Sequence, residues 1–560
     1  DDYIDAGAGD DFVFEGEVNW GGGLIDMFGD IPDLTIGELV NFGAGNDILD
    51  GGDGFDELNY FGYQRPVIMN FQTDRIYQNG EVDIFRNFEF VVLSDVNDIV
   101  ITDEQAFSVL LQAGDDRVVN FIDNSELFGG EGIDTVDART MQADILIDAA
   151  NNRTLIDGFF IGGTIFEFER YWGATEFRNT ITSTDVNSQI LGGNRADTLT
   201  GGSGNDTVSG RGGNDTIRGG AGNDLLQGGD GNDTLFGAGG RNTIHGGNGN
   251  DRLNNSGDNS LLTGGAGEDV LINTGDGTRI KGQGGADRIE STGADVTASG
   301  GGGNDTIISN GNRAILSGDD GNDTLNAFGR SVEVSGNAGN DEIFLRQGKA
   351  FGGNGDDRIK LADGFTGSTA NLGNGDDVAL IRGTGNSIFA GAGADIINLL
   401  GDNHRAFGGN DNDIINIGDR SGAGSQSGAT IQAGGGNDIL YVFTDAASVR
   451  GNTGNDRFNI FTNETSLSGL SGGAGADTFH FNEFGANTTI RITDFNTGAD
   501  RLDIEGLSSL GDLISLSTVS GDARLVFDHT SEVFDAGASF EVTLILEGVA
   551  AASLSDAVLL

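Results

Sequence analysis

Aspartates at a fixed place in a short glycine-rich motif are the residues of this chain that could do chemistry. The motif Gly-Gly-x-Gly-Asn-Asp occupies residues 228–233 and returns at 246–251. Each copy offers one carboxylate and several backbone carbonyls, which are the hard oxygen ligands that Ca²⁺ prefers. One turn cannot supply the roughly six to eight oxygens that Ca²⁺ takes, so a site would need two stacked turns. Magnesium requires a tighter octahedron, and zinc favours Cys or His, of which the chain has none and four.

The motif aspartates form a long series. From residue 228 the full motif recurs every 18 residues as far as 336. We expect metal binding at the sixth-position aspartates Asp197, Asp215, Asp233, Asp251, Asp269, Asp287, Asp305, Asp323, Asp341, Asp357, Asp377, Asp395, Asp413, Asp438, Asp456 and Asp477. Beyond Asp341 the steps vary, but extra residues such as 421–428 fall between the motifs. Arg195 and Asp411 replace the fourth-position glycine, so their two turns are the least regular.

The nine-residue blocks between these motifs have lost the aspartate. Asn242 stands where the aspartate is expected, and only Asp206 and Asp224 make a full pair in the intervening series. The repeating unit is therefore 18 residues, with alternate turns on opposite edges of the fold. We expect metal on one edge only through residues 228–341, and on both edges near Asp206 and Asp224. Replacing Asn259 on the other edge is expected to cost little.

The three residues after each motif have the alternation of a short strand, with a large aliphatic residue in the middle. Examples are Val208, Ile217, Leu226 and Leu235. A three-residue strand cannot stand alone and must stack on copies of itself about 4.8 Å away. Two strands and two turns close one coil of 18 residues. The fold class predicted is all-β, a parallel β-roll or β-helix solenoid.

The motif density divides the chain into three predicted regions. Residues 1–190 carry scattered motifs, with Asp47, Asp56 and Asp134 as further metal candidates, and read as wider β-coils with two inserted modules. Their aromatic residues fit a thicker core better than a sugar-binding groove. Residues 191–482 form the regular roll, and 483–560 read as a β-rich cap, as repeat arrays require. The first five residues resemble the end of a repeat, so we expect a longer protein.

The overall composition excludes several classes of protein. The formal net charge is −57 over 560 residues, with 98 glycines, two prolines and no cysteine. Such acidity also suits a disordered chain, but the repeats favour a folded one that uses cations as counterions. Nucleic acid is excluded as a partner because phosphate binding needs clustered Lys and Arg. No apolar run is long enough for a transmembrane segment.

The tandem motifs resemble the RTX (repeats-in-toxin) calcium-binding nonapeptide repeats. The resemblance implies calcium-induced folding outside a Gram-negative cell, after export by the type I secretion machinery. It also implies that carbonyls of the turn glycines join the aspartates as ligands; these glycines are Gly229, Gly231, Gly247, Gly249, Gly265, Gly267, Gly301 and Gly303. Residues 492–507 and 556–560 resemble the C-terminal signal of type I substrates. The sparse second edge departs from relatives that bind calcium on both edges.

The motifs of the catalytic domains that often accompany such repeats are missing from the sequence. It contains no His-Glu-x-x-His, no Gly-x-Ser-x-Gly elbow between strand and helix, and no phosphate loop with Gly-Lys-Ser/Thr. We therefore expect a non-enzymatic, secreted structural protein, such as a surface-layer, sheath or filament component. Self-assembly or binding of cell-surface polysaccharide would suit that role. The alternative is the calcium-dependent folding and secretion module of a larger RTX enzyme, toxin or adhesin.

Overall fold

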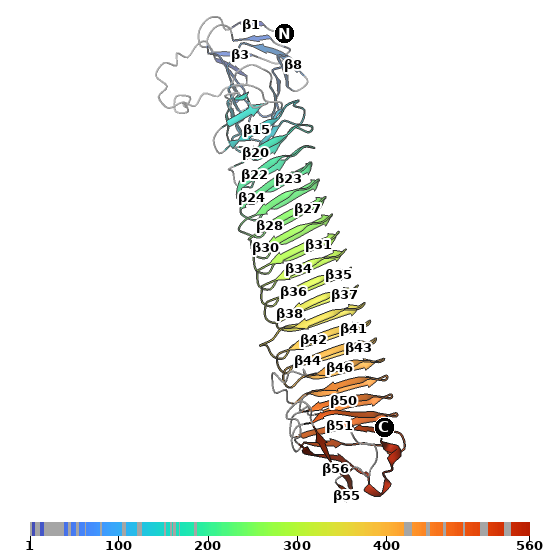
Figure 1. Cartoon of the computed structure of the whole chain (residues 1–560). Coiled ribbons are helices and arrows are strands. Elements are labelled where there is room, and N and C mark those ends of the chain that lie inside the picture. The colour runs from blue at the N-terminus through green and yellow to red at the C-terminus, as the bar shows by residue number, and fades with distance from the viewer. Residues whose placement is uncertain are drawn as a thin grey trace. The chain divides into compact units, whose positions relative to one another are not determined.

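The computed structural model confirms an all-β, parallel solenoid (Figure 1). It describes residues 3–559 except 6–11, 16–38, 43–45, 47, 52–54, 62, 79–80, 103–107, 120–125, 150–152, 157–158, 161–163, 167, 184–186, 419–427, 444–447, 463–465, 485–487, 505–512, 514 and 531–538. The chain forms two compact units, residues 1–275 and 276–560.

The predicted 18-residue coil is present in both units. Strand Thr198–Ser203 pairs in parallel with Thr216–Ala221, residue for residue 18 positions later, and Leu199 faces Ile217. Both aliphatic side chains are fully buried, while the threonines beside them point outward. One large aliphatic side chain per strand therefore fills the core, as the alternation predicted.

The first unit contains strands of three sheets. One sheet is made of β1 (Tyr3–Asp5), β4 (Ile48–Asp50), β6 (Ile68–Asn70), β7 (Arg75–Gln78), β8 (Glu81–Arg86), β10 (Ile99–Ile101), β12 (Arg117–Val119), β14 (Thr135–Asp137), β19 (Arg170–Trp172), β21 (Gln189–Leu191), β23 (Thr207–Gly212), β25 (Leu225–Asp230), β27 (Thr243–Asn248) and β29 (Leu261–Ala266). The second is β2 (Phe12–Glu15), β3 (Leu39–Phe42), β5 (Glu57–Asn59), β9 (Phe90–Val92), β11 (Ser108–Leu110), β13 (Glu126–Phe128) and β18 (Thr164–Phe166). The third is β15 (Ile145–Asp148), β16 (Arg153–Ile156), β17 (Phe159–Phe160), β20 (Asn179–Thr182), β22 (Thr198–Ser203), β24 (Thr216–Ala221), β26 (Thr234–Gly237), β28 (Arg252–Asn255) and β30 (Val270–Asn273).

The second unit has two stacks of strands. The odd-numbered stack is β31 (Arg279–Gly284), β33 (Thr297–Gly302), β35 (Ile315–Asp320), β37 (Val332–Ala338), β39 (Gly348–Asn354), β41 (Thr369–Asn374), β43 (Ser387–Ala392), β45 (Arg405–Asn410), β47 (Thr430–Gly435), β49 (Ser448–Thr453), β51 (Ser466–Ala474) and β53 (Thr489–Ile492), joined by β55 (Ser515–Val519), β56 (Asp522–Thr530) and β57 (Ser539–Leu546). The even-numbered stack is β32 (Arg288–Ser291), β34 (Thr306–Ser309), β36 (Thr324–Ala327), β38 (Glu342–Leu345), β40 (Arg358–Leu361), β42 (Val378–Arg382), β44 (Ile396–Leu400), β46 (Ile414–Ile417), β48 (Ile439–Val442), β50 (Arg457–Thr462), β52 (Thr478–Phe484) and β54 (Arg501–Ile504). Two short 3₁₀ helices follow, η4 (Ala551–Ser553) and η5 (Asp556–Val558).

Three antiparallel segments interrupt the parallel stacking. Strands β6–β7–β8 and β15–β16–β17 are hairpins that pair with the parallel coils of the first unit. In the second unit β55–β56–β57 is antiparallel, and β57 pairs with β53. These strands cover the last coils of that unit.

The turns between strands are compact because glycine occupies positions that no side chain could enter. Gly229 and Gly231 have φ of 118° and 124°, in the region that favours glycine. A methyl group at either position would run into the backbone carbonyl oxygen of Arg211 or Gly213 in the preceding coil. The predicted ligand glycines of the next coils, including Gly247, Gly249, Gly265, Gly267, Gly301 and Gly303, share this geometry.

Candidate metal centre

A ladder of buried aspartates runs along one edge of the first unit, which we call the aspartate edge. It consists of the turns that lead into β22, β24, β26, β28 and β30. The backbone N–H of each aspartate donates to Oδ1 of the aspartate one coil later, at 2.7 Å from Asp197 to Asp215 and 2.8 Å from Asp233 to Asp251. Their exposed fractions are 2% or less. The fold therefore brings the predicted aspartates into one column.

The second unit has the same ladder on the turns that lead into its even-numbered strands. Asp287, Asp305, Asp323, Asp341, Asp357, Asp377, Asp395, Asp413, Asp438, Asp456 and Asp477 are linked by the same hydrogen bond, at 2.7–2.9 Å. Asp477 donates onward to Asp500 Oδ1 at 3.1 Å. The coil of irregular length at each step after Asp341 leaves the ladder intact, as the spacing predicted.

The second carboxylate oxygen of these aspartates is buried without a hydrogen-bond donor. This holds for Oδ2 of Asp206, Asp215, Asp224, Asp233, Asp251, Asp305, Asp323, Asp341, Asp357, Asp377, Asp395, Asp413, Asp438, Asp456 and Asp477. Burying an ionised carboxylate costs several kcal/mol unless it is paired with a cation or coordinates a metal. The ladder is therefore stable at neutral pH only with cations beside it.

Each such oxygen meets further acceptors rather than donors. A methyl group placed on Gly228 would contact both Asp233 Oδ2 and the carbonyl oxygen of Gly246 in the next coil. The same arrangement joins Asp251 Oδ2 to Gly264. Carboxylate and carbonyl oxygens thus converge between successive coils, which is the donor set of a Ca²⁺ site. Among the described residues no three Asp, Glu, His or Cys side chains cluster, so most ligands must come from the backbone.

Two asparagines in equivalent turns show how the chain satisfies this place without a cation. Asn242 Nδ2 donates to the Ala238 carbonyl at 3.1 Å, and Asn386 Nδ2 donates to the Arg382 carbonyl at 2.8 Å. An amide N–H thus reaches the carbonyl that lies four residues back in its own turn. An aspartate has no such donor, so a cation has to occupy that role.

The ends of the ladders differ from their interiors. Asp197 Oδ2 accepts the Gly193 N–H at 2.6 Å, and Asp500 Oδ2 accepts the Asn496 N–H at 2.7 Å. Both carboxylates are satisfied by protein donors. Asp197 lies in the turn where Arg195 replaces glycine, whereas Asp413, in the turn with Asp411, keeps a buried Oδ2 without a donor. Asp197 is thus the weakest of the predicted ligands.

The opposite edge lacks a carboxylate column over the coils where the motif lapses. In the first unit the equivalent buried places hold Asn242 and Ser260, and in the second Thr278, Val296, Ala314 and Val332. Asn255 and Asn273 close these turns, because each donates its amide to the glycine carbonyl two residues on, at 2.8 and 2.7 Å. The expectation for Asn259 needs revision: its φ is 54°, so Ala would cost about 1 kcal/mol and Gly little.

A second acidic ladder precedes Asp206 and Asp224 in the first unit. Asp98 donates to Asp116 at 2.6 Å, Asp116 to Asp134 at 2.9 Å, and Asp134 to Glu169 Oε2 at 2.9 Å. The strands that follow, β10, β12, β14 and β19, share one sheet with β23 and β25, which follow Asp206 and Asp224. The opposite edge is therefore acidic up to Asp224, and the coils from 197 to 233 carry aspartates on both edges.

Asp98 and Asp116 were not among the predicted ligands. Their 18-residue steps to Asp134 were a usable signal that the poor glycine content of their turns concealed. Asp116 is 1% exposed and its Oδ2 has no donor, whereas both Asp98 oxygens accept from Ser94. Asp56 is also buried, with its N–H bonded to Glu89 Oε2 at 2.9 Å. Asp47 lies outside the described residues.

Burial raises the pKa of the ladder carboxyls in the metal-free chain. The pKa of Asp305 rises to about 6, that of Asp251 to about 7 and that of Asp215 to about 8. Burial is the largest cause in each case, and the charge of neighbouring ladder aspartates adds to it. A proton and a calcium ion therefore compete for the same oxygens.

We predict that acid partly replaces calcium in stabilising the fold. A carboxyl whose folded pKa is raised contributes stability that is complete below its unfolded pKa of about 4 and is lost as pH rises through about 6–8. In chelator, circular dichroism should show β-structure increasing from about pH 8 to about pH 5, still above the isoelectric point of about 4.1. A β signal that weakens over this range would contradict the argument. Calcium-loaded protein, the control, should show no such gain.

Fold and site together define a class of protein: a parallel β-solenoid whose stacked turns enclose cations between coils. A family model described as the RTX calcium-binding nonapeptide repeat matches at residues 1–14, 43–58, 191–226, 219–253, 227–262, 281–313, 317–349 and 430–442. The chain belongs to the RTX calcium-binding repeat proteins, and its cofactor is Ca²⁺ at multiple sites.

One solved structure illustrates the similarity. It is the solution structure of the AlgE6R3 subunit from the Azotobacter vinelandii mannuronan C5-epimerase, which shares 27% identity with this chain. The match covers 27% of this chain and 78% of that chain, with a TM-score of 0.13. No curated protein matches the sequence. In the part of the chain that the structure describes, no helix is long and apolar enough to cross a membrane.

Proposed function

We propose that this is a secreted structural protein of the bacterial cell surface or extracellular matrix, which folds when it meets calcium outside the cell. The observation that carries the proposal is the length of the ladder: in both units, coil after coil holds a buried carboxylate oxygen without a donor. Extracellular modules work with calcium in roughly the millimolar range. In the calcium-poor cytoplasm the same carboxylates would repel one another and keep the chain unfolded.

The structural role is supported by where the chemistry of the chain is spent. The buried carboxylates follow one another at coil spacing and share their hydrogen bonds with the backbone of the next coil, which suits scaffold cations rather than a reaction centre. The gene sequence ahead of Asp1 tests this most directly. A surface-anchoring region or further repeats would support a structural protein. A catalytic domain there would overturn it in favour of the folding module of a larger enzyme or toxin.

We also propose that residues 483–560 direct export through the type I secretion machinery. Deleting them should leave the protein inside a Gram-negative host that carries the machinery, and a reporter fused to residues 483–560 alone should appear in the medium. Immunoblots of medium and cells measure both. Normal export of the truncated chain, or retention of the reporter, would refute the assignment. The reporter matters because the truncated chain also loses Asp500, which ends the aspartate ladder.

A further inference from the structure

The outer face of the even-numbered strands in the second unit carries a groove that the calcium sites do not use. It has a volume of about 270 Å³ and lies across β36, β38, β40 and β42. We propose that this groove binds an extended anionic polysaccharide, of the kind that bears uronate carboxylates. The proposal needs the proposed function only for its folded, calcium-loaded coils.

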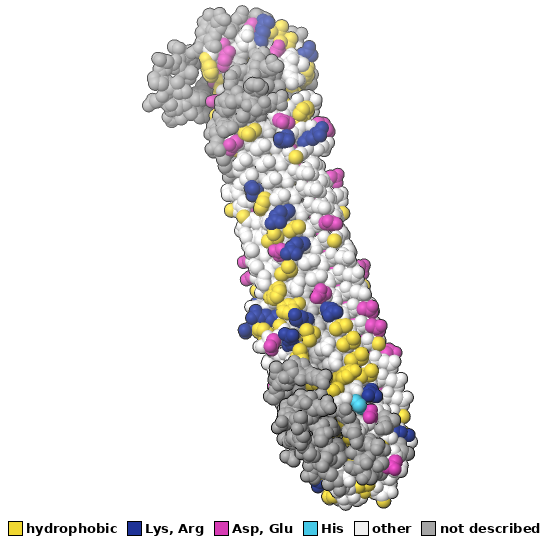
Figure 2. All heavy atoms as spheres, viewed as in Figure 1, with side chains coloured by type: hydrophobic (Ala, Val, Ile, Leu, Met, Phe, Trp, Pro, Cys, Tyr) yellow, Lys and Arg dark blue, Asp and Glu magenta, His cyan; other side chains and the backbone are white. Residues whose placement is uncertain are grey.

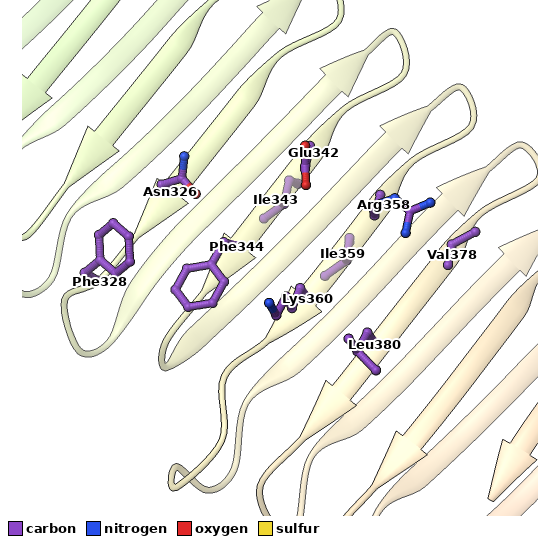
Figure 3. A pocket seen from close by; sticks show the side chains of 10 residues that line it. All are labelled: Asn326, Phe328, Glu342, Ile343, Phe344, Arg358, Ile359, Lys360, Val378 and Leu380. Atoms are coloured by element: carbon purple, nitrogen blue, oxygen red, sulfur yellow. The ribbon is translucent and has the colours of Figure 1, made fainter. Parts of the chain in front are cut away.

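Two rows of outward side chains line the groove (Figure 3). Pairing of the strands places Phe344 beside Lys360 and Lys360 beside Leu380, while Glu342, Arg358 and Val378 form the other row. The aliphatic residues between them, Ile343 and Ile359, face inward and are buried. Since the groove residues are not part of the core, they are available to a ligand.

The aromatic and basic groups stand side by side. The rings of Phe328 and Phe344 have centroids 5.2 Å apart, and Phe328 is 38% exposed. Lys360 Nζ lies 5.7 Å from the Phe344 centroid. The C–H face of a sugar ring packs on an aromatic ring, and a uronate carboxylate pairs with Lys or Arg. The groove therefore offers both contacts within one strand spacing, about 4.8 Å, which is comparable to the length of one sugar in an extended chain.

An irregularity in the coils produces this surface. The ladder step from Asp341 to Asp357 is 16 residues and the next, to Asp377, is 20. A two-residue turn after β38 is followed by a seven-residue turn after β40, in which Phe365 lies under the Arg346 guanidinium, 4.6 Å from its ring centroid. The regular coil is therefore broken where aromatic and basic side chains gather.

The charge of this face is opposite to that of the chain. On the outward positions of β34 to β48 in the even-numbered stack, the only acidic side chain is Glu342, against Arg358, Lys360 and Arg382. Neither Arg358 nor Lys360 has an ion pair within the described structure. Figure 2 shows dark-blue basic side chains beside yellow hydrophobic ones on the visible face of this region. The acids lie in the turns, where calcium offsets their charge, and salt screens them beyond about 8–10 Å.

The rest of the face suits a carbohydrate better than a second copy of this chain. Side-chain amides of Asn326, Asn398 and Asn416 alternate with half-buried aliphatic residues along the stack, and Asn416 Nδ2 donates to Asn398 Oδ1 at 2.9 Å. Amides beside rings match sugar hydroxyls beside sugar faces. Two copies that each carry a net charge of −57 repel each other.

Calorimetric titration of the calcium-loaded full chain with hyaluronan oligosaccharides, an alternating uronate polymer, tests the proposal. Wild type should bind, and Phe344→Ala and Lys360→Gln should each weaken binding about tenfold. Arg252→Gln, an exposed outer-face change in the first unit, is the matched control and should bind normally. Circular dichroism of the same samples shows that each variant is folded, so loss of binding with an intact β signal concerns the groove and not the proposed function.

Four outcomes would overturn the proposal. They are no binding by wild type, equal binding by the groove variants, equal binding of polyglutamate, which would reduce the effect to charge alone, and loss of self-association in the variants without a change in oligosaccharide binding. Light scattering detects the last, which would make this face a contact between copies. Weaker binding of neutral dextran than of hyaluronan is the expected specificity.

Discussion

Removing calcium is expected to unfold the chain, because the metal is what makes the buried carboxylates tolerable. Each coil buries a single large aliphatic side chain per strand, such as Leu199 and Val208, and folding fixes many glycines that are flexible when unfolded. A cation that binds only the folded state adds about 2.7 kcal/mol per site at a hundred times its dissociation constant. Summed over the ladder, this exceeds the roughly 5–15 kcal/mol that a domain has in total.

Far-UV circular dichroism of the protein in chelator and in millimolar calcium measures this effect. We expect a disordered spectrum in chelator at neutral pH, a β spectrum after calcium is added, and reversal on repeated chelation. Magnesium at the same concentration is the control and should restore little, since it demands a tighter octahedron. A full β signal at neutral pH after complete removal of metal would contradict the account.

Replacing one interior ladder aspartate by asparagine should have effects of opposite sign with and without calcium. Asp305 is 1% exposed, its Oδ1 accepts the Asp287 N–H at 2.7 Å, and its Oδ2 has no donor. Asp305→Asn keeps the first contact and loses a charged ligand, so it should destabilise the calcium-loaded protein by about 3–5 kcal/mol. In chelator below neutral pH it should stabilise the residual fold, because an amide can donate as Asn242 does.

Asp276→Asn is the matched control for this prediction. Asp276 is exposed on the opposite edge of the same unit, and its Oδ1 accepts the Ala294 N–H at 2.7 Å, a bond that asparagine retains. The change should stay within about 0.5 kcal/mol in either condition. Urea unfolding at fixed calcium gives both values. Equal effects of the two substitutions in calcium would show that the aspartate edge has no special role.

The sequence alone allowed the fold and the main ladder to be predicted, because both follow from one period. The aspartates from Asp215 to Asp477 recur with the strand residues, so any parallel stacking in register aligns them. The lapse at Asn242 was also informative: every second turn lies on the other edge, where an amide replaces the carboxylate and its cation.

Other features were hidden because they depend on which neighbours a turn meets in space. The shares of Asp197 and Asp500 in the ladder depend on N–H groups of Gly193 and Asn496 that no motif encodes. Asp116 joins a ladder although its turn has little glycine. The groove beside Phe344 arises from two turns of unequal length, whose effect on the sheet face appears only when the coils are stacked.

A map of bound calcium is the most direct test of the central claim. Crystals grown in calcium, with anomalous scattering to locate the ions, should show metal between successive coils beside Asp233 and Asp251 in the first unit and beside Asp305, Asp323 and Asp341 in the second. The opposite edge should be free of metal beside Ser260, Val296, Ala314 and Val332, and should hold metal beside Asp206 and Asp224. Metal columns of equal occupancy on both edges of these coils, or none beside the aspartates, would contradict the account.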